Sequence, residues 1–114
     1  MSGLLVAFVA LEHAAFLVLE MFLWERPVGL RIFGQTPQAA KQSAVLAMNQ
    51  GLYNGFLSAG LIWGLLAEPS LGVPVTRFFL ACVVVAGAFG AVSLRKPRVF
   101  LIQGLPALLA LALM

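Results

Sequence analysis

Charged residues are scarce in this sequence. Only 10% of its 114 residues are Asp, Glu, Lys or Arg, whereas a soluble domain has about 25%. Hydrophobic residues make up 62%, more than a soluble fold of this length could bury. The composition therefore excludes an ordinary soluble domain and indicates a membrane protein, in line with a mean hydropathy of +1.04.

Cysteine and histidine are almost absent, with one of each, Cys82 and His13. A single cysteine excludes an intrachain disulfide and a zinc site built from cysteines, so Cys82 is expected to be a buried apolar thiol. The Glu-x-x-His spacing of di-metal helix bundles is also absent, and no metal ligands are predicted. Haem held by His13, with Tyr53 or Asn54 on its other side, stays an alternative, and the cofactor is left open.

No basic face interleaved with exposed aromatics is present, which excludes a nucleic-acid reader. The net charge of +3 is instead explained by cations that set the orientation in the membrane and contact anionic lipid.

Long apolar runs dominate the chain, at about 4–24, 44–67, 75–94 and 99–114. Each is close to the roughly 20 residues that a helix needs to cross a bilayer. We therefore predict an all-α membrane protein, a four-helix transmembrane bundle that forms a single integral membrane domain over residues 1–114.

Prolines mark the predicted helix ends. Thr36 offers a capping hydroxyl before Pro37, so the second helix should begin near Pro37, with its first turns in the membrane interface. Residues 68–74 are expected to form a turn. Pro106 should kink the short fourth helix because it lacks a backbone donor.

The cations predict the orientation. Six of the seven basic residues lie in the two loops that follow spans one and three, so both loops should be cytoplasmic and both termini outside. The first span holds Glu12 and His13 and ends in bulky residues, which argues against a cleaved signal peptide. The six loop cations are Arg26, Arg31, Lys41, Arg95, Lys96 and Arg98, and the seventh is Arg77.

Polar residues inside the first two spans are the main functional signal. Glu12, His13 and Glu20 share an arc of about 100° on one helix, and a second polar stripe follows on the next. Unpaired groups of this kind cost several kcal/mol in hydrocarbon, so the stripes should meet. Counting depth from the cytoplasmic ends predicts an inner layer of Glu20, Asn49, Gln50 and Gln103. The same count predicts a middle layer of Glu12, His13, Tyr53 and Asn54.

Two glycine pairs on the second span indicate close helix packing. Gly51 and Gly55 point away from the polar stripe, whereas Gly60 and Gly64 continue it outward. One interpretation is that the second helix contacts the first near Gly60 and Gly64, and another helix or a second protomer near Gly51 and Gly55. A homo-oligomer through glycine-rich faces is thus a possible assembly.

The segments LEHAAFLVLEMFLW, FGQTPQ and AMNQGLYNGFLSAGLIWG resemble the signature of a family of small bacterial membrane proteins known as domain of unknown function 1304. The resemblance covers nearly the whole chain and implies a fold of four helices in a bacterial inner membrane. It brings no established activity and no family site residues.

The function is therefore predicted from the polar residues. Ionisable groups inside a span usually mark ligand or ion pathways, so we predict a site that binds a small apolar or lipid-like molecule and could isomerise or hydrate it by acid/base chemistry. Whether the protein is an enzyme stays open. The alternatives are a proton-coupled carrier or channel subunit acting as an oligomer, a haem or metal protein, and a structural subunit whose polar groups only fix helix register. The predicted catalytic residues are Glu12, His13 and Glu20, and the predicted substrate-binding residues are Asn49, Gln50, Tyr53, Asn54 and Gln103.

Overall fold

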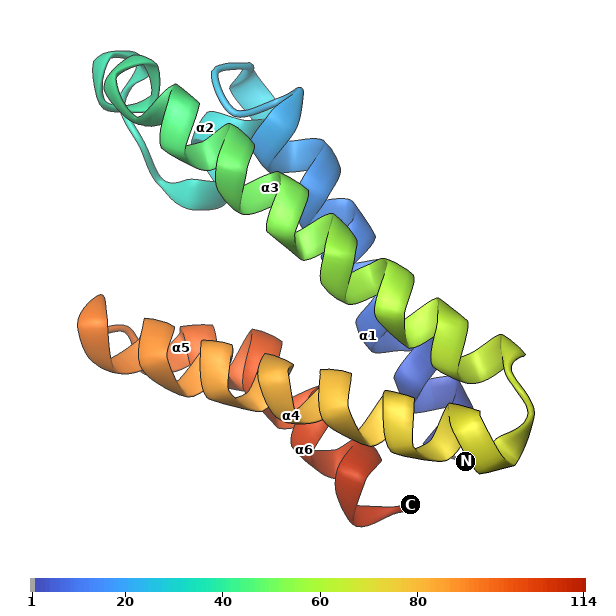
Figure 1. The fold of residues 1–114 in the computed structure, drawn as a ribbon. Coiled ribbons are helices and arrows are strands. Elements are labelled where there is room, and N and C mark those ends of the chain that lie inside the picture. The colour runs from blue at the N-terminus through green and yellow to red at the C-terminus, as the bar shows by residue number, and fades with distance from the viewer. Residues whose placement is uncertain (1) are drawn as a thin grey trace. The chain divides into compact units, whose positions relative to one another are not determined.

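The computed structural model describes residues 2–114, and the chain folds into helices with no strand in that range. The predicted all-α class is therefore confirmed (Figure 1). Met1, the first residue of the predicted domain, lies outside the described residues. The helices are α1 (Ser2–Met21), α2 (Pro27–Phe33), α3 (Pro37–Leu66), α4 (Pro69–Ser93), α5 (Pro97–Val99), the π-helical segment η1 (Phe100–Gly104) and α6 (Leu105–Ala112).

Proline begins four of these helices, α2, α3, α4 and α5. A proline at the first helical position loses nothing, because the N–H it lacks has no partner there, and its fixed φ suits the helix. The predicted start of the second long helix at Pro37 is confirmed. Thr36 caps it, since its Oγ1 accepts a hydrogen bond of 3.1 Å from the Ala39 backbone N–H.

Replacing Thr36 with alanine is expected to destabilise the start of α3 by about 0.5–2 kcal/mol, the usual contribution of an N-cap. Amide hydrogen exchange of the first turns measures this loss directly. Thr36→Ser keeps the hydroxyl and is the matched control. Equal exchange in the alanine and serine variants would show that the cap contributes nothing.

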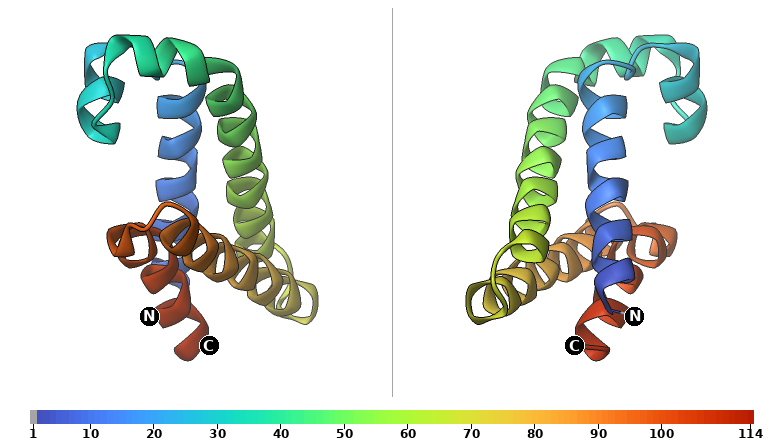
Figure 2. Two further views of the ribbon diagram at one scale, coloured as in Figure 1. Left: turned by 90° about the vertical axis from the view of Figure 1, so that its left-hand side faces the viewer. Right: turned by 90° about the vertical axis from the view of Figure 1, so that its right-hand side faces the viewer.

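The first turns of α3 run at a steep angle to the rest of the helix (Figure 2). Ser43 lies in this region, and its Oγ donates to the carbonyl oxygen of Ala39, four residues earlier, at 2.8 Å. A serine that bonds back to this carbonyl often bends a helix. The bend separates a polar start of α3 from its long apolar remainder.

The predicted turn over residues 68–74 is wrong. Helix α4 already begins at Pro69, and Pro74 lies inside it. The Gly72 backbone N–H donates to the Glu68 carbonyl oxygen at 2.6 Å, which starts the helix. Pro74 removes only one such bond, near the start of the helix, a loss that the remaining turns tolerate.

The last helical region contains a π-helical segment directly before Pro106. The N–H of Leu105 bonds to the carbonyl oxygen of Phe100, five residues back. Such π-bulges re-satisfy backbone groups where a regular ladder is interrupted, here next to a residue without an N–H. The departure from regular α-helix expected at Pro106 therefore begins earlier, at Phe100.

Two helices, α1 and α4, are long and apolar enough to cross a membrane by length and composition. Helix α3 is not among them, and its apolar sequence contains the three amides Asn49, Gln50 and Asn54. The region Pro97–Ala112 is apolar but shorter than 18 residues.

The chain divides into two compact units, which are described separately. The first, called the C-terminal unit, combines residues 2–11 with Leu57–Met114. In it the Ser58 hydroxyl donates to the Ala10 carbonyl oxygen at 2.7 Å. Gly87 lets α4 approach the backbone of Gly104, where a Cβ on Gly87 would lie 2.8 Å from the Gly104 nitrogen. The buried core of this unit contains Val6, Val9, Ala10, Leu61, Leu80, Val83, Ala107 and Ala110.

The second unit, Glu12–Phe56, packs the end of α1 against the middle of α3. A Cβ on Gly51 would lie 2.6 Å from the Met21 Cγ and 3.2 Å from the Leu17 carbonyl oxygen. A Cβ on Gly55 would lie 2.5 Å from the Leu17 Cδ1. The interpretation that this glycine pair faces another helix or a second protomer is therefore wrong, because it faces α1.

The second glycine pair packs within the C-terminal unit. Gly60 faces the ring of Phe79, and Gly64 faces Thr76 and the backbone of Gly72. Both partners of this pair lie on α4. The sequence therefore predicted the wrong pair for the contact with α1. The prediction assumed that the polar stripe of α3 faces α1, and Gly60 and Gly64 continue that stripe.

Candidate functional site

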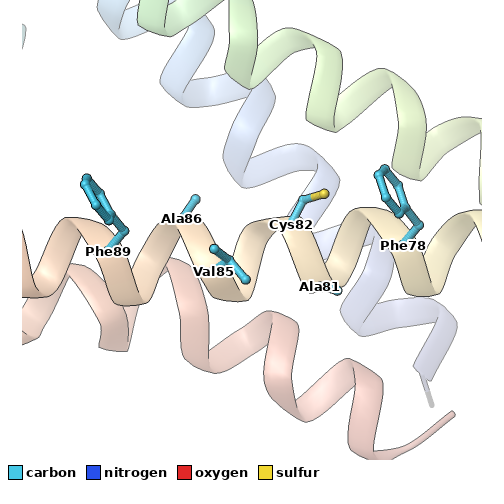
Figure 3. Close-up of a pocket in the computed structure, with 6 residues that line it drawn as sticks. All are labelled: Phe78, Ala81, Cys82, Val85, Ala86 and Phe89. Carbon is cyan, nitrogen blue, oxygen red and sulfur yellow. The ribbon is translucent and has the colours of Figure 1, made fainter.

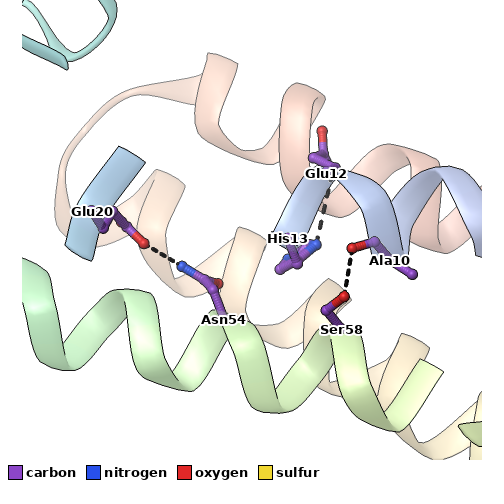
Figure 4. A network of polar contacts seen from close by, with 6 residues as sticks. All are labelled: Ala10, Glu12, His13, Glu20, Asn54 and Ser58. Carbon is purple, nitrogen blue, oxygen red and sulfur yellow. Dashed lines mark hydrogen bonds and ion pairs between the residues drawn. The ribbon is translucent and has the colours of Figure 1, made fainter. Parts of the chain in front are cut away.

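One interhelical hydrogen bond organises the polar groups of the Glu12–Phe56 unit. The Asn54 side-chain N–H donates to Glu20 Oε1 at 2.5 Å (Figure 4). Asn54 is buried, with 4% of its surface exposed. The prediction that each layer pairs within itself is therefore wrong, because Glu20 of the predicted inner layer bonds to Asn54 of the predicted middle layer.

The reason for this pairing is the direction of helical side chains. Side chains lean toward the N-terminus of their helix. Helices α1 and α3 run antiparallel here, since Gly51 and Gly55 contact progressively earlier residues of α1. Glu20 and Asn54 therefore lean toward each other and meet although their Cα atoms lie at different heights.

A pocket opens beside Glu20, at the end of α1 that leads into α2. Its volume is about 340 Å³, at the small end of ligand pockets. We call it the Trp24 pocket. Its lining combines charged with apolar side chains, namely Glu20, Met21, Phe22, Trp24, Glu25, Arg26, Ala44 and Met48.

The Trp24 ring is fixed in this wall from two sides. Its Nε1–H donates to Ser43 Oγ at 3.1 Å, and its ring packs against Phe33 with centroids 4.8 Å apart. Ser43 in turn donates to Ala39, so the residue that accompanies the bend of α3 also positions the tryptophan. Helix α2, which carries Phe33, ends at Gly34 in the left-handed conformation, φ 63°.

Glu12 and His13 form a second polar pair in the same unit. The His13 Nδ1 lies 4.0 Å from Glu12 Oε1 (Figure 4). His13 is fully buried, and its ring meets Phe16 edge to face at 5.3 Å. Glu12 Oε1 is buried without a hydrogen-bond partner in the described part of the chain. Such an oxygen favours a role beyond packing, because an unmade hydrogen bond destabilises the fold.

The remaining predicted binding residues lie on α3 and in the C-terminal unit. Asn49, Gln50 and Tyr53 are exposed on α3, Tyr53 with 57% of its surface. None of them lines the Trp24 pocket. Gln103 is half-buried in the C-terminal unit.

Residues 2–114 contain no group of three or more His, Cys, Asp or Glu side chains placed to hold a metal ion. Glu12 and His13 alone would supply two donors. The arrangement suits proton transfer and hydrogen bonding better than metal ligation, since a stable site needs more ligands.

A second hollow lies on α4 and is entirely apolar (Figure 3). Its volume is about 500 Å³. The Cys82 sulfur is its one heteroatom in a side chain, and Phe78 and Phe89 stand at its ends. With no polar group to orient a ligand, it is an apolar face of a helix and not a candidate for chemistry.

Sequence reasoning missed most of the pocket wall. From the sequence, Arg26 is assigned a role in topology alone, and Trp24 is assigned none. Met48 and Ala44 were not considered. Their spacing of four residues on α3, beside the small residues Ala47 and Gly51, is the signal that could have placed them on the α1 side.

The fold and the site together define a small all-helical protein with apolar helices and buried polar groups. The chain belongs to the family described as Protein of unknown function (DUF1304), whose profile matches residues 7–114. It is 31% identical over 105 residues to the Uncharacterized protein YpaA of Lactococcus lactis subsp. lactis (strain IL1403), which covers 90% of this chain and 87% of that protein. No solved structure matches.

Proposed function

We propose that the chain is an integral membrane protein with four spans. Helices α1 and α4 supply two, and only 22% of the residues in the apolar window of each are buried, unlike the core helix of a soluble protein. The apolar part of α3 after its bend and the region Pro97–Ala112 would supply the others. Hydrocarbon is the solvent that suits such exposed surfaces.

The orientation rests on the basic residues. The connections from α1 to α3 and from α4 to α5 carry four of the seven cations, and two more, Lys41 and Arg98, lie in the helical turns that directly follow them. The positive-inside rule places both connections in the cytoplasm and both termini outside. The angle between the first turns of α3 and the rest of the helix (Figure 2) supports this orientation, because it lets Lys41 lie along the cytoplasmic interface. A bacterial inner membrane fits the bacterial source of the relative.

The proposed function is to bind a small apolar or lipid-like molecule at the cytoplasmic end of α1. One observation carries it: the Trp24 pocket joins a half-buried carboxyl, Glu20, to an apolar wall that includes Met21 and Met48. Apolar pockets with a few fixed polar groups are the usual ligand sites of proteins. The ligand would place its polar end at Glu20 and its apolar part against the methionines.

Acid/base chemistry on this ligand is the finer part of the proposal. Glu20 would exchange a proton with the bound molecule, while Asn54 holds its carboxyl group in one orientation. Isomerisation or hydration of an apolar molecule needs such a group within hydrogen-bond reach. The Glu12–His13 pair would be the second acid/base group, at greater depth.

Replacing Glu20 with glutamine is expected to lower the amount of ligand that copurifies by about tenfold, as for the loss of about 1.4 kcal/mol of binding. Mass spectrometry of organic extracts from purified protein measures it. Glu68→Gln removes the same charge at an exposed position outside the pocket and is the control. An extract that contains no specific molecule, or the same amount from both variants, contradicts the proposal.

A proton-coupled carrier is the second candidate, and the Glu12–His13 pair favours it. A buried carboxyl oxygen that accepts no hydrogen bond from residues 2–114 and lies 4.0 Å from a histidine nitrogen resembles one step of a proton relay. Such a carrier would act as a homo-oligomer. Since both glycine pairs of α3 pack within the chain, the exposed stripe of Asn49, Gln50 and Tyr53 would form the contact between protomers.

A further inference from the structure

The Trp24 pocket has more acidic than basic side chains. Glu20 and Glu25 provide two carboxyl groups, and Arg26 provides one guanidinium group. Glu25 and Arg26 are exposed, whereas Glu20 is half-buried. The carboxyl group that a ligand meets deepest in the pocket is therefore that of Glu20.

Glu20 has no cationic partner among residues 2–114. Its hydrogen-bond partner is the neutral amide of Asn54, and the ion pair within residues 2–114 joins His13 to Glu12. A carboxylate removed from water is stabilised only when a positive charge or several donors compensate it. A cationic group in the pocket would supply this compensation.

The neighbouring tryptophan also favours a cation. Trp24 lines the pocket, and its position is fixed by Ser43 and Phe33. An ammonium group close to an indole ring gains cation–π energy, and most where water is excluded. A ring that is already fixed loses no side-chain freedom when the cation binds.

The apolar part of the lining fits an apolar chain. Met21, Phe22 and Met48 form it, and Phe22 and Met48 are 67% and 48% exposed. Methionine adapts its shape to irregular ligands. Because Phe22 and Met48 are exposed, a chain too long for a pocket of about 340 Å³ can extend past them into the surrounding hydrocarbon.

We propose that the Trp24 pocket binds an ammonium group carried on an apolar chain, with the ammonium between Glu20 and Trp24. This inference rests on the proposed function and names the class of its ligand. The ammonium could belong to a free lipophilic amine or to an aminophospholipid headgroup. In the second case Arg26, at the exposed rim, would pair with the phosphate.

The test uses Trp24 as its own reporter. The full chain in the Trp63→Phe background keeps a single tryptophan and is reconstituted in phosphatidylglycerol nanodiscs, which contain no ammonium group. Two quenchers of equal chain length are compared, a bromoalkyl trimethylammonium and the matching bromoalkyl alcohol. The measurement is the quencher concentration in the membrane that halves Trp24 fluorescence.

We expect the cation to quench at an at least about tenfold lower concentration than the alcohol, which corresponds to 1.4 kcal/mol. Glu20→Gln should remove most of this preference. Glu20→Asp should keep part of it, and Glu68→Gln should keep all of it because the residue lies outside the pocket. The comparison of the two quenchers in the Trp63→Phe background needs no change to the pocket and holds even if Glu20→Gln does not fold.

Equal, saturable quenching by the cation and the alcohol would overturn this inference and leave the proposed function standing. Quenching by neither at saturating levels would overturn both. Repeating the titration in phosphatidylethanolamine nanodiscs identifies the source. Weaker quenching by the added cation there supports a lipid headgroup as occupant, and unchanged quenching supports a free lipophilic amine.

Discussion

Replacing Gly51 with valine is expected to destabilise the protein by about 1–3 kcal/mol, the usual effect of overpacking a tight contact. The Cβ of any residue at this position would lie 2.6 Å from the Met21 Cγ and 3.1 Å from the Glu20 Cβ. The methionine side chain can move, but the Leu17 carbonyl oxygen at 3.2 Å belongs to the α1 backbone. Helices α1 and α3 must therefore separate locally to admit the two methyl groups of valine.

Titration with sodium dodecyl sulfate, followed by circular dichroism, measures this loss of stability in mixed micelles. Gly3→Val is the matched control, because a Cβ on Gly3 has no atom within 4 Å. It makes the same substitution in a helix without the close contact. If the two variants unfold at the same detergent fraction, the close approach of α1 and α3 at Gly51 does not contribute to stability.

The Gly51 variant also affects the site. Glu20 is both a neighbour of Gly51 and the acceptor of the Asn54 hydrogen bond. A separation of the helices at this level moves the carboxyl group away from the amide. Ligand that copurifies with the protein should therefore decrease together with stability, whereas Gly3→Val should leave both unchanged.

The helix boundaries were predictable because local chemistry determines them. Proline can begin a helix without losing a hydrogen bond, and Thr36 can cap one, whatever the rest of the chain does. The same property explains the error at residues 68–74. Pro69 was interpreted as part of a turn although it equally suits the first position of a helix, and only the packing of α4 decides between the two.

The pairing of the polar residues was not predictable from depth and angle alone. Depth was counted along Cα positions, yet Glu20 and Asn54 meet through side chains that lean in opposite directions. Asn49 and Tyr53 share an arc with each other and lie on an exposed face of α3. The size of the residues at 47, 51 and 58 was the better guide, because close helix contact requires small side chains.

The Trp24 pocket was even less predictable from the sequence than the polar pairing, because its walls come together only in the tertiary structure. Trp24 follows the end of α1 and meets Ser43 across 19 positions of sequence. That contact exists only because α2 and the bend of α3 return the chain to α1 (Figure 2). Composition and periodicity describe single helices, and neither contains this information.

Replacing Asn54 with leucine is expected to destabilise the protein by about 1–3 kcal/mol, because the carboxyl group of Glu20 then lacks its hydrogen-bond donor. Glu20→Leu should have a similar effect, since it leaves the buried amide of Asn54 without its acceptor. The double variant replaces both partners by apolar groups of similar size. It should be more stable than the sum of the two single losses indicates.

A double-mutant cycle on Glu20 and Asn54, measured by the same detergent titration, gives their coupling energy. Interhelical hydrogen bonds between membrane helices reach about 1.7 kcal/mol in such cycles, and we expect a value of at least about 1 kcal/mol here. The control cycle pairs Glu20 with Asn49, a residue of the same type on the same helix that is exposed in the structure. Depth counted along the sequence predicts coupling to Asn49, whereas the structure predicts coupling to Asn54 and none to Asn49. A larger coupling in the control cycle would contradict the structural pairing, and with it the orientation of Glu20 on which ligand binding at the Trp24 pocket depends.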